Sequence, residues 1–117
     1  MNVLKKITYL SKNGIETRPV WYLNHLQKPY IQTVLDYGGG GSDWDAPNFE
    51  PTTNESAKQF FHLKDVHTFE PARNLLEKRK SDCVVCMDVL EHLHISDVPT
   101  VVKELFFLAK QLLIINV

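Results

Sequence analysis

The sequence lacks the features that mark several large classes of protein. Acidic and basic residues nearly cancel, with 14 Asp and Glu against 13 Lys and Arg, so no broad positive surface favours nucleic acid. No stretch approaches the roughly 20 consecutive apolar residues of a membrane span, and the first residues lack the apolar run of a secretory signal. We therefore expect a cytoplasmic protein with no membrane partner, and we do not expect nucleic acid as a partner either.

Cysteine is also scarce. The only two, Cys83 and Cys86, form a C-x-x-C pair. Redox versions of this motif place the first cysteine at the start of a helix, and zinc sites need a second pair of ligands. Neither condition is met, because the residues from Asp82 to Asp88 have the pattern of a buried strand, in which cysteine behaves as a small hydrophobic residue. The pair is predicted to be structural.

The chain does contain a series of short apolar runs separated by segments with helical spacing. At 117 residues it fits one domain, 1–117, with a single core. The apolar spacing predicts two N-terminal helices, at 2–12 and 17–28. They would form a helical extension over 1–29, ahead of a core over 30–117.

The core is expected to form a parallel sheet. Its strands are the continuous apolar runs at 31–36, 66–69, 83–87 and 112–115. The elements expected between them are a loop at 42–56, a helix at 57–63 capped by Ser56, a helical stretch ending near Lys80, and a helix capped by Ser96 or Asp97. Because apolar residues run continuously along these strands, both faces of the sheet should be covered. The predicted fold class is α/β, with a doubly wound, mainly parallel sheet.

The last apolar run bears on association. A parallel sheet that ends on residues 112–115 would leave an apolar edge, which isolated monomers seldom tolerate. We therefore expect either that the chain self-associates into a homo-oligomer or that it is a fragment of a longer protein.

The most informative segment follows the first core strand, where Asp36 and Tyr37 lead into four glycines, Gly38 to Gly41. Glycines directly after a strand allow positive φ angles and let bare backbone approach a ligand. Parallel sheets build nucleotide pockets at this end of a strand. Asp36 would then meet a cationic or hydroxyl-bearing part of the ligand. An ordinary flexible loop is the alternative.

Acids also follow the next two strands, at Glu70 and Asp88. An acid after the second strand is the expected partner of ribose hydroxyls, since a carboxylate can accept from both. A nicotinamide dinucleotide is disfavoured, because the third glycine of its G-x-G-x-x-G fingerprint would fall on Asp43. In addition, Glu70 lies 29 residues after Gly41, where that fingerprint expects about 20.

Together these motifs resemble the class I S-adenosylmethionine-dependent methyltransferases. The resemblance covers residues 31–117 and is carried by three blocks, Val34–Gly41, Phe69–Ala72 and Asp82–Leu93. It implies a Rossmann-like fold that binds S-adenosylmethionine. The residues that it assigns to the cofactor are Gly38, Gly40 and Gly41 beside the methionyl part, Asp36 toward the amino group, Glu70 on the ribose, and Asp88 and Val89 at the adenine and methionine ends.

The resemblance has departures. An acidic, proline-containing loop follows the glycines, and the final antiparallel strands of the family have no counterpart before Val117. The expected function is therefore a methyltransferase, or the cofactor-binding part of one, with a small-molecule methyl acceptor. The alternatives are a catalytically inert partner module and a nicotinamide oxidoreductase.

Glu91 and His92 are the candidate catalytic residues. They directly follow the third block's strand, and a carboxylate–imidazole pair there can act as general base for the acceptor. Some relatives with a similar block bind a divalent metal, for which Asp88, Glu91 and His92 would be ligands, with His94 as a further one. The other interpretation gives the pair packing or hydrogen-bonding roles only.

Overall fold

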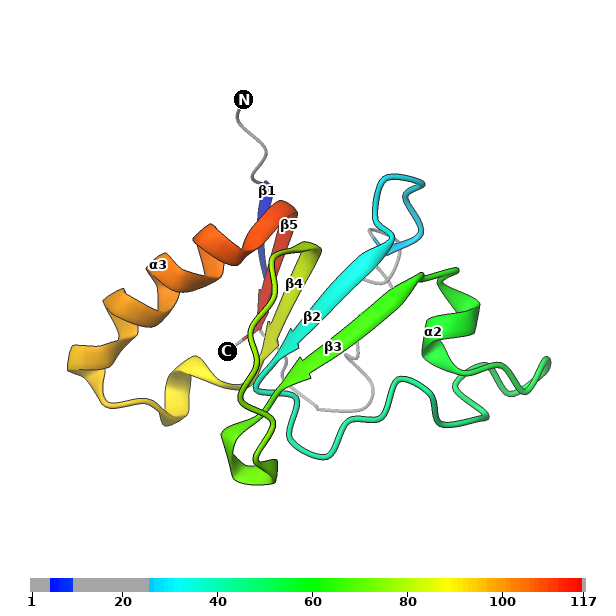
Figure 1. Cartoon of the computed structure of the whole chain (residues 1–117), viewed down its shortest axis with the longest axis horizontal. Coiled ribbons are helices and arrows are strands. Elements are labelled where there is room, and N and C mark those ends of the chain that lie inside the picture. The colour runs from blue at the N-terminus through cyan, green and yellow to red at the C-terminus, as the bar shows by residue number, and fades with distance from the viewer. Residues whose placement is uncertain (1–4, 10–25, 117) are drawn as a thin grey trace.

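The computed structural model describes residues 5–9 and 26–116 (Figure 1). Its centre is a five-stranded sheet in which every neighbouring pair is parallel. In spatial order the strands are β1 (Lys5–Tyr9), β5 (Ala109–Asn116), β4 (Ser81–Met87), β2 (Thr33–Tyr37) and β3 (Asp65–Phe69). An α/β protein with a parallel sheet is what the continuous apolar runs predict, and that part of the predicted fold class is confirmed.

Two helices cover opposite faces of the sheet, α2 (Ala57–Phe60) and α3 (Val98–Leu108) (Figure 1). On the α2 face, Val34 of β2 packs with Phe61 in one buried cluster. On the α3 face, Leu35 of the same strand packs with Leu105 in a second cluster. Adjacent residues of a strand thus enter different cores, because side chains alternate between the two faces.

The strand order reverses in the middle of the sheet. After β2, the chain places β3 on one side of it and then returns to place β4 on the other side. Parallel sheets leave a crevice at such a reversal, beyond the carboxyl ends of the strands, and ligands bind there. The ends of β2 and β4, at Tyr37 and Met87, therefore mark where a site is expected.

The N-terminal region corrects one prediction. Residues 5–9 form β1 and pair with Leu112–Asn116 of β5, so the expected helix over 2–12 is wrong across these residues. Long-range pairing decides here, and the sequence Ile7-Thr8-Tyr9 suits a strand better than a helix. Most of the second expected helix, 17–28, lies outside the described residues. The predicted helical extension over 1–29 therefore contributes a strand to the sheet.

The position of β1 also removes the argument for self-association. Residues 112–115 were expected to form the sheet's edge, but β5 lies between β4 and β1. The backbone groups expected to be unpaired there are hydrogen-bonded on both sides. Self-association stays a prediction without this support.

Elsewhere the elements largely match the sequence analysis. Ser56 caps α2 through a capping box with Gln59, although the helix ends at Phe60 instead of residue 63. Asp97 is the N-cap of α3 but makes no side-chain hydrogen bond there. The preceding turn, Ile95–Asp97, is capped by the His94 side chain instead.

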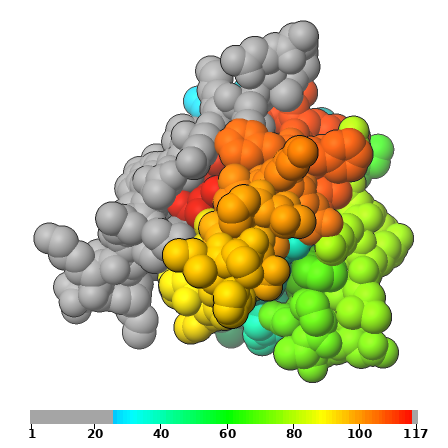
Figure 2. Space-filling view, turned by 90° about the vertical axis from the view of Figure 1, so that its left-hand side faces the viewer, coloured from blue at the N-terminus to red at the C-terminus, as the bar shows by residue number. Residues whose placement is uncertain are grey.

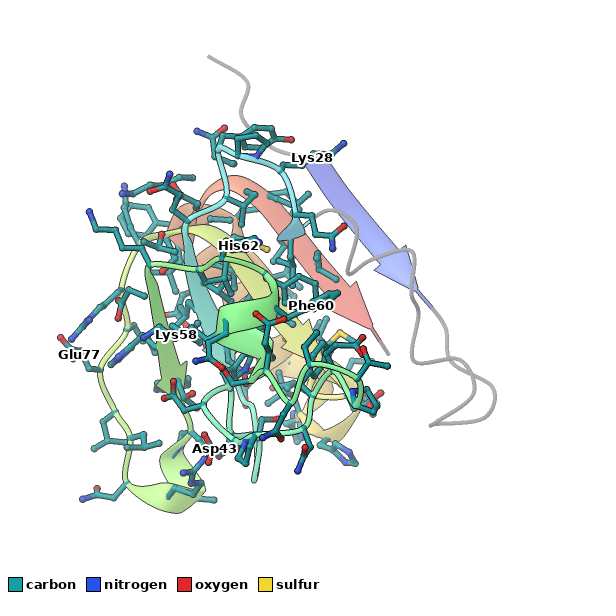
Figure 3. The ribbon with its side chains drawn as sticks, turned by 90° about the vertical axis from the view of Figure 1, so that its right-hand side faces the viewer. Lys28, Asp43, Lys58, Phe60, His62 and Glu77 are labelled. Atoms are coloured by element: carbon teal, nitrogen blue, oxygen red, sulfur yellow. The ribbon has the colours of Figure 1, made fainter. Side chains whose placement is uncertain are left out.

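The expected helical stretch up to Lys80 is wrong. A single 3₁₀ turn, Pro71–Arg73, ends at Asn74, whose φ of 57° is left-handed and stops the helix. The chain then runs without regular structure along the outside of β3, where the His67 ring nitrogen lies 2.9 Å from the Glu77 carbonyl. Glu77 is labelled in Figure 3 at this edge of the sheet.

The two cysteines behave as predicted. Both are free thiols buried in β4, with no exposed surface. Burial raises the pKa of Cys83 and of Cys86, so neither is a reactive thiolate at neutral pH.

Candidate binding cleft

An open cleft of about 450 Å³ lies at the reversal of strand order, on the α3 side of the sheet. Its walls come from the ends of β2 and β3, from the segments that follow β2, β3 and β4, and from α3. Figure 2 shows this side, with α3 in orange, the segment after β4 in yellow and the segment after β3 in green. The lining residues are Tyr37, Gly38, Phe69, Glu70, Pro71, Ala72, Asp88, Val89, His92, Leu93 and Val101.

The cleft brings together five of the nine residues that the sequence analysis selected, from three separate segments. They are Gly38 after β2, Glu70 after β3, and Asp88, Val89 and His92 after β4. The other four, Asp36, Gly40, Gly41 and Glu91, do not line it. Each of the three predicted blocks therefore contributes at least one residue to the same cavity.

The first half of the glycine loop is fixed by packing. Gly38 has a φ of +75°, and a Cβ added there would lie 2.5 Å from the Val89 Cγ2 atom. A Cβ on Gly39 would lie 2.6 Å from the carboxyl carbon of Asp36. A larger residue cannot enter either position without displacing a neighbour, and the Gly38 backbone amide also donates to the Phe69 carbonyl at 2.7 Å.

The second half of the loop is fixed by hydrogen bonds instead. Nothing lies within 4 Å of a Cβ built on Gly40 or Gly41. The Gly40 amide donates to Glu70 Oε1 at 2.7 Å, and Arg73 Nη1 donates to the Gly40 carbonyl at 3.0 Å. Gly40 also has a φ of +58°, a conformation that glycine adopts without steric cost.

Glu70 stands between this loop and the cleft. Its second oxygen, Oε2, accepts from the Ala72 amide at 3.1 Å and so caps the 3₁₀ turn Pro71–Arg73. A carboxylate offers about four acceptor positions, of which these two bonds occupy two. Glu70 therefore keeps capacity for hydroxyl donors from a ligand in the cleft that it lines.

Asp36 lies on the other face of the sheet. Strand alternation puts it beside Val34 on the α2 face, where Trp44 Nε1 donates to its Oδ2 at 2.8 Å. Burial raises the pKa of this carboxyl group, the Trp44 hydrogen bond opposes that shift, and the nearby Glu70 charge adds to it. Asp36 therefore does not line the cleft, and the structure gives no support to its predicted contact with a ligand amino group.

The segment after β4 presents its polar groups at the rim of the cleft. Asp88 adopts a left-handed φ of 56°, and the short 3₁₀ turn Leu90–His92 follows. His92 lines the cleft but Glu91 does not, so the predicted pair is divided. Across residues 5–9 and 26–116, no three Asp, Glu, His or Cys side chains come together as a metal ion would require. The metal version of the hypothesis, with Asp88, Glu91, His92 and His94, therefore has no support from geometry.

The sequence analysis did not predict a pair of aromatic rings in the cleft or the charged side chains that contact them. The rings of Tyr37 and Phe69 are 4.8 Å apart and line the cleft. Lys78 Nζ lies 4.6 Å from the Phe69 ring centroid and 2.7 Å from Glu104 Oε1, and the Tyr37 hydroxyl donates to the other oxygen of Glu104. Burial and then this hydrogen bond raise the Tyr37 pKa, so the phenol stays protonated. The aromatic residues at strand ends were the only signal in the sequence.

Comparison with known proteins adds no assignment. No protein-family model, curated protein or solved structure matches this chain. Within the described ranges, every helix is too short or too polar to cross a bilayer.

Proposed function

We propose that the chain is a Rossmann-like S-adenosylmethionine-binding protein, acting as a methyltransferase or as the cofactor-binding part of one. One observation carries the proposal. The three blocks that resemble the methyltransferases, the first and third of which are separated by 40 residues of sequence, contribute residues to one cleft at the strand-order reversal. That is where doubly wound sheets bind nucleotide-like ligands.

The chemistry of the cleft suits such a ligand. Its volume of about 450 Å³ lies within the range of small-molecule and cofactor sites. The Tyr37–Phe69 pair supplies an apolar aromatic surface, and Glu70 supplies a carboxylate with spare acceptor capacity for ribose hydroxyls. Gly38, which packs against Val89, contributes its backbone to the lining of the cleft.

Methyl transfer asks little further of the protein. The sulfonium is already a good leaving group, so the main task is to hold the acceptor in line with the methyl group and to exclude water. His92 at the cleft rim is the residue that we assign as general base, for a small acceptor that carries a hydroxyl or an amine. Glu91 does not line the cleft and has no role in this proposal.

A cofactor-binding module without turnover is the second candidate. One observation favours it: His92 lines the cleft without Glu91, so the carboxylate–imidazole pair expected for catalysis is not assembled there. Such a module would bind S-adenosylmethionine and its demethylated product but would transfer no methyl group. Methyl transfer from labelled S-adenosylmethionine to a panel of small hydroxyl and amine acceptors separates the two.

The direct test is titration calorimetry of the purified chain. We expect S-adenosylmethionine and its demethylated product to bind, and NAD not to bind under the same conditions. Binding of NAD alone would instead support the nicotinamide oxidoreductase alternative. Absence of binding by both methyl-donor ligands would refute the proposal, provided that the folded state is confirmed by far-UV circular dichroism.

A further inference from the structure

The glycine loop depends on two side chains from a single turn. Packing does not fix Gly40 and Gly41, because the space around their Cβ positions is empty. Glycine loses more conformational entropy than any other residue when it is ordered. Something other than van der Waals contact must therefore hold this half of the loop, and the 3₁₀ turn after β3 provides it.

The turn holds Gly40 from both of its backbone groups. Glu70, the N-cap of the turn, accepts the Gly40 N–H at 2.7 Å, and Arg73, at its end, donates to the Gly40 carbonyl at 3.0 Å. The same Arg73 nitrogen lies 3.4 Å from the Ser42 carbonyl. We propose that Arg73 is the positioning residue of the cofactor loop, which keeps Gly40 aligned with Glu70 while Glu70 binds the ligand. This inference rests on the proposed function.

The physical reason is that Glu70 would have two tasks, to accept from the Gly40 amide and to accept from the ribose hydroxyls of the ligand. When ribose hydroxyls compete for the carboxylate, its bond to the Gly40 amide weakens unless the loop is held independently. Arg73 supplies that second contact through its Nη1 atom, which lies within 3.4 Å of both the Gly40 and the Ser42 carbonyl, and its guanidinium is always charged. Lysine keeps the positive charge but replaces the planar guanidinium with a compact, strongly hydrated ammonium group on a different stem, so we expect it to restore these contacts only in part.

The experiment compares four proteins: the wild type, Arg73→Ala, Arg73→Lys and Arg79→Ala. Arg79 is the matched control, an exposed arginine whose partners, Asp65 and Glu77, lie away from the loop. Two quantities are measured for each: amide hydrogen exchange by NMR, and affinity for the demethylated product of S-adenosylmethionine by calorimetry.

Arg73→Ala should speed exchange at the Gly40 and Ser42 amides by about threefold to tenfold, as expected for loss of one exposed hydrogen bond. Amides in β2 and β4 should be unaffected. Product affinity should fall by a similar factor, Arg73→Lys should recover part of both losses, and Arg79→Ala should match the wild type. A contact that only stabilised the loop would change exchange at Gly40 and Ser42 but would leave product affinity at the wild-type level.

Two results would overturn the inference. One is unchanged exchange at Gly40 in Arg73→Ala, and the other is an equal loss of affinity in Arg79→Ala. If the wild type does not bind the product at all, the proposed function has failed. The exchange data then decide alone whether Arg73 holds the loop.

Discussion

At the carboxyl end of β2, the α2 face of the sheet is covered, whereas the α3 face has an open cleft. On the α2 face, the last polar residue of β2, Asp36, is only 4% exposed and is covered by Trp44. On the α3 face, the neighbouring positions Tyr37 and Gly38 open into the cleft. Figure 3 looks onto the α2 side, with Lys58 and Phe60 of α2 and the following His62 labelled. Consecutive residues of one strand therefore serve a closed core and an open site.

The comparison distinguishes a buried acid, Asp36, from an acid that lines the cleft, Glu70. The sequence resemblance assigned both acids to the cofactor. One has its carboxylate closed off by an indole, whereas the other shares its carboxylate between backbone amides and the cleft. We therefore expect changes at Asp36 to alter stability and changes at Glu70 to alter ligand affinity.

The largest expected effect is at Gly38. The change Gly38→Val puts a β-branched residue at a φ of +75° and against Val89. The left-handed conformation costs roughly 1–2 kcal/mol and overpacking about 1–3 kcal/mol more. Urea denaturation should therefore show a loss of about 2–5 kcal/mol. Gly41→Val is the control, because the space around Gly41 is open. Equal losses of stability in the two variants would show that packing does not hold Gly38.

His92 tests whether the α3 face is reactive. His92→Ala should lower the rate of methyl transfer by about 100-fold or more, the usual contribution of a general base. Cofactor affinity should be unchanged. The measurement is single-turnover transfer from labelled S-adenosylmethionine to an acceptor found in the panel. His62→Ala, an exposed histidine on the α2 side, should have no effect, and a wild-type rate in His92→Ala would remove the residue from the mechanism.

The variant Glu70→Ala tests whether this acid, unlike Asp36, contributes to ligand affinity. Glu70→Ala removes a charged acceptor, typically worth about 1.5–3 kcal/mol, so calorimetry should show affinity for the demethylated product falling by tens-fold. Glu50→Ala is the control, because Glu50 is a half-buried loop glutamate that accepts from Thr52 within its own turn. A change below about threefold in Glu70→Ala would mean that the ligand does not use this carboxylate.

How far the sequence could predict this site depends on the kind of interaction. The buried runs at 83–87 and 112–115 were predictable, because hydrophobic continuity alone identifies a covered strand. The strand at 5–9 was not, because its partner lies more than 100 residues away. Likewise, Arg73 contacts a residue 33 positions earlier, and no local pattern records such a contact.

The face that a residue occupies was also beyond the sequence argument. The glycines after β2 predicted the edge of the sheet at which the cleft lies, and Glu70 and Asp88 line that cleft, as their positions after β3 and β4 led us to expect. Placing Asp36 required the alternation of β2 to be counted against the two buried clusters. A shift of one residue decides whether a carboxylate faces a ligand or an indole.

The smallest expected effect concerns pH and Asp36. Burial raises the pKa of this carboxyl group in the folded protein above its ordinary value. The folded state then binds the proton more tightly than the unfolded state, so the group favours folding at low pH. That contribution is fully present below the unfolded pKa, near 4, and is lost as pH rises through the folded one.

Asp36→Asn removes the titration and keeps an oxygen acceptor for Trp44. Between pH 4 and pH 7, the difference in unfolding free energy between the variant and the wild type should therefore move in favour of the variant. The free energies of both proteins are measured by urea denaturation at each pH, and subtraction cancels the other carboxylates. Product affinity should stay at the wild-type level, because Asp36 faces away from the cleft. A pH-independent difference would show that the Asp36 pKa is not raised. A large loss of product affinity would show that Asp36 contributes to ligand binding although it does not line the cleft.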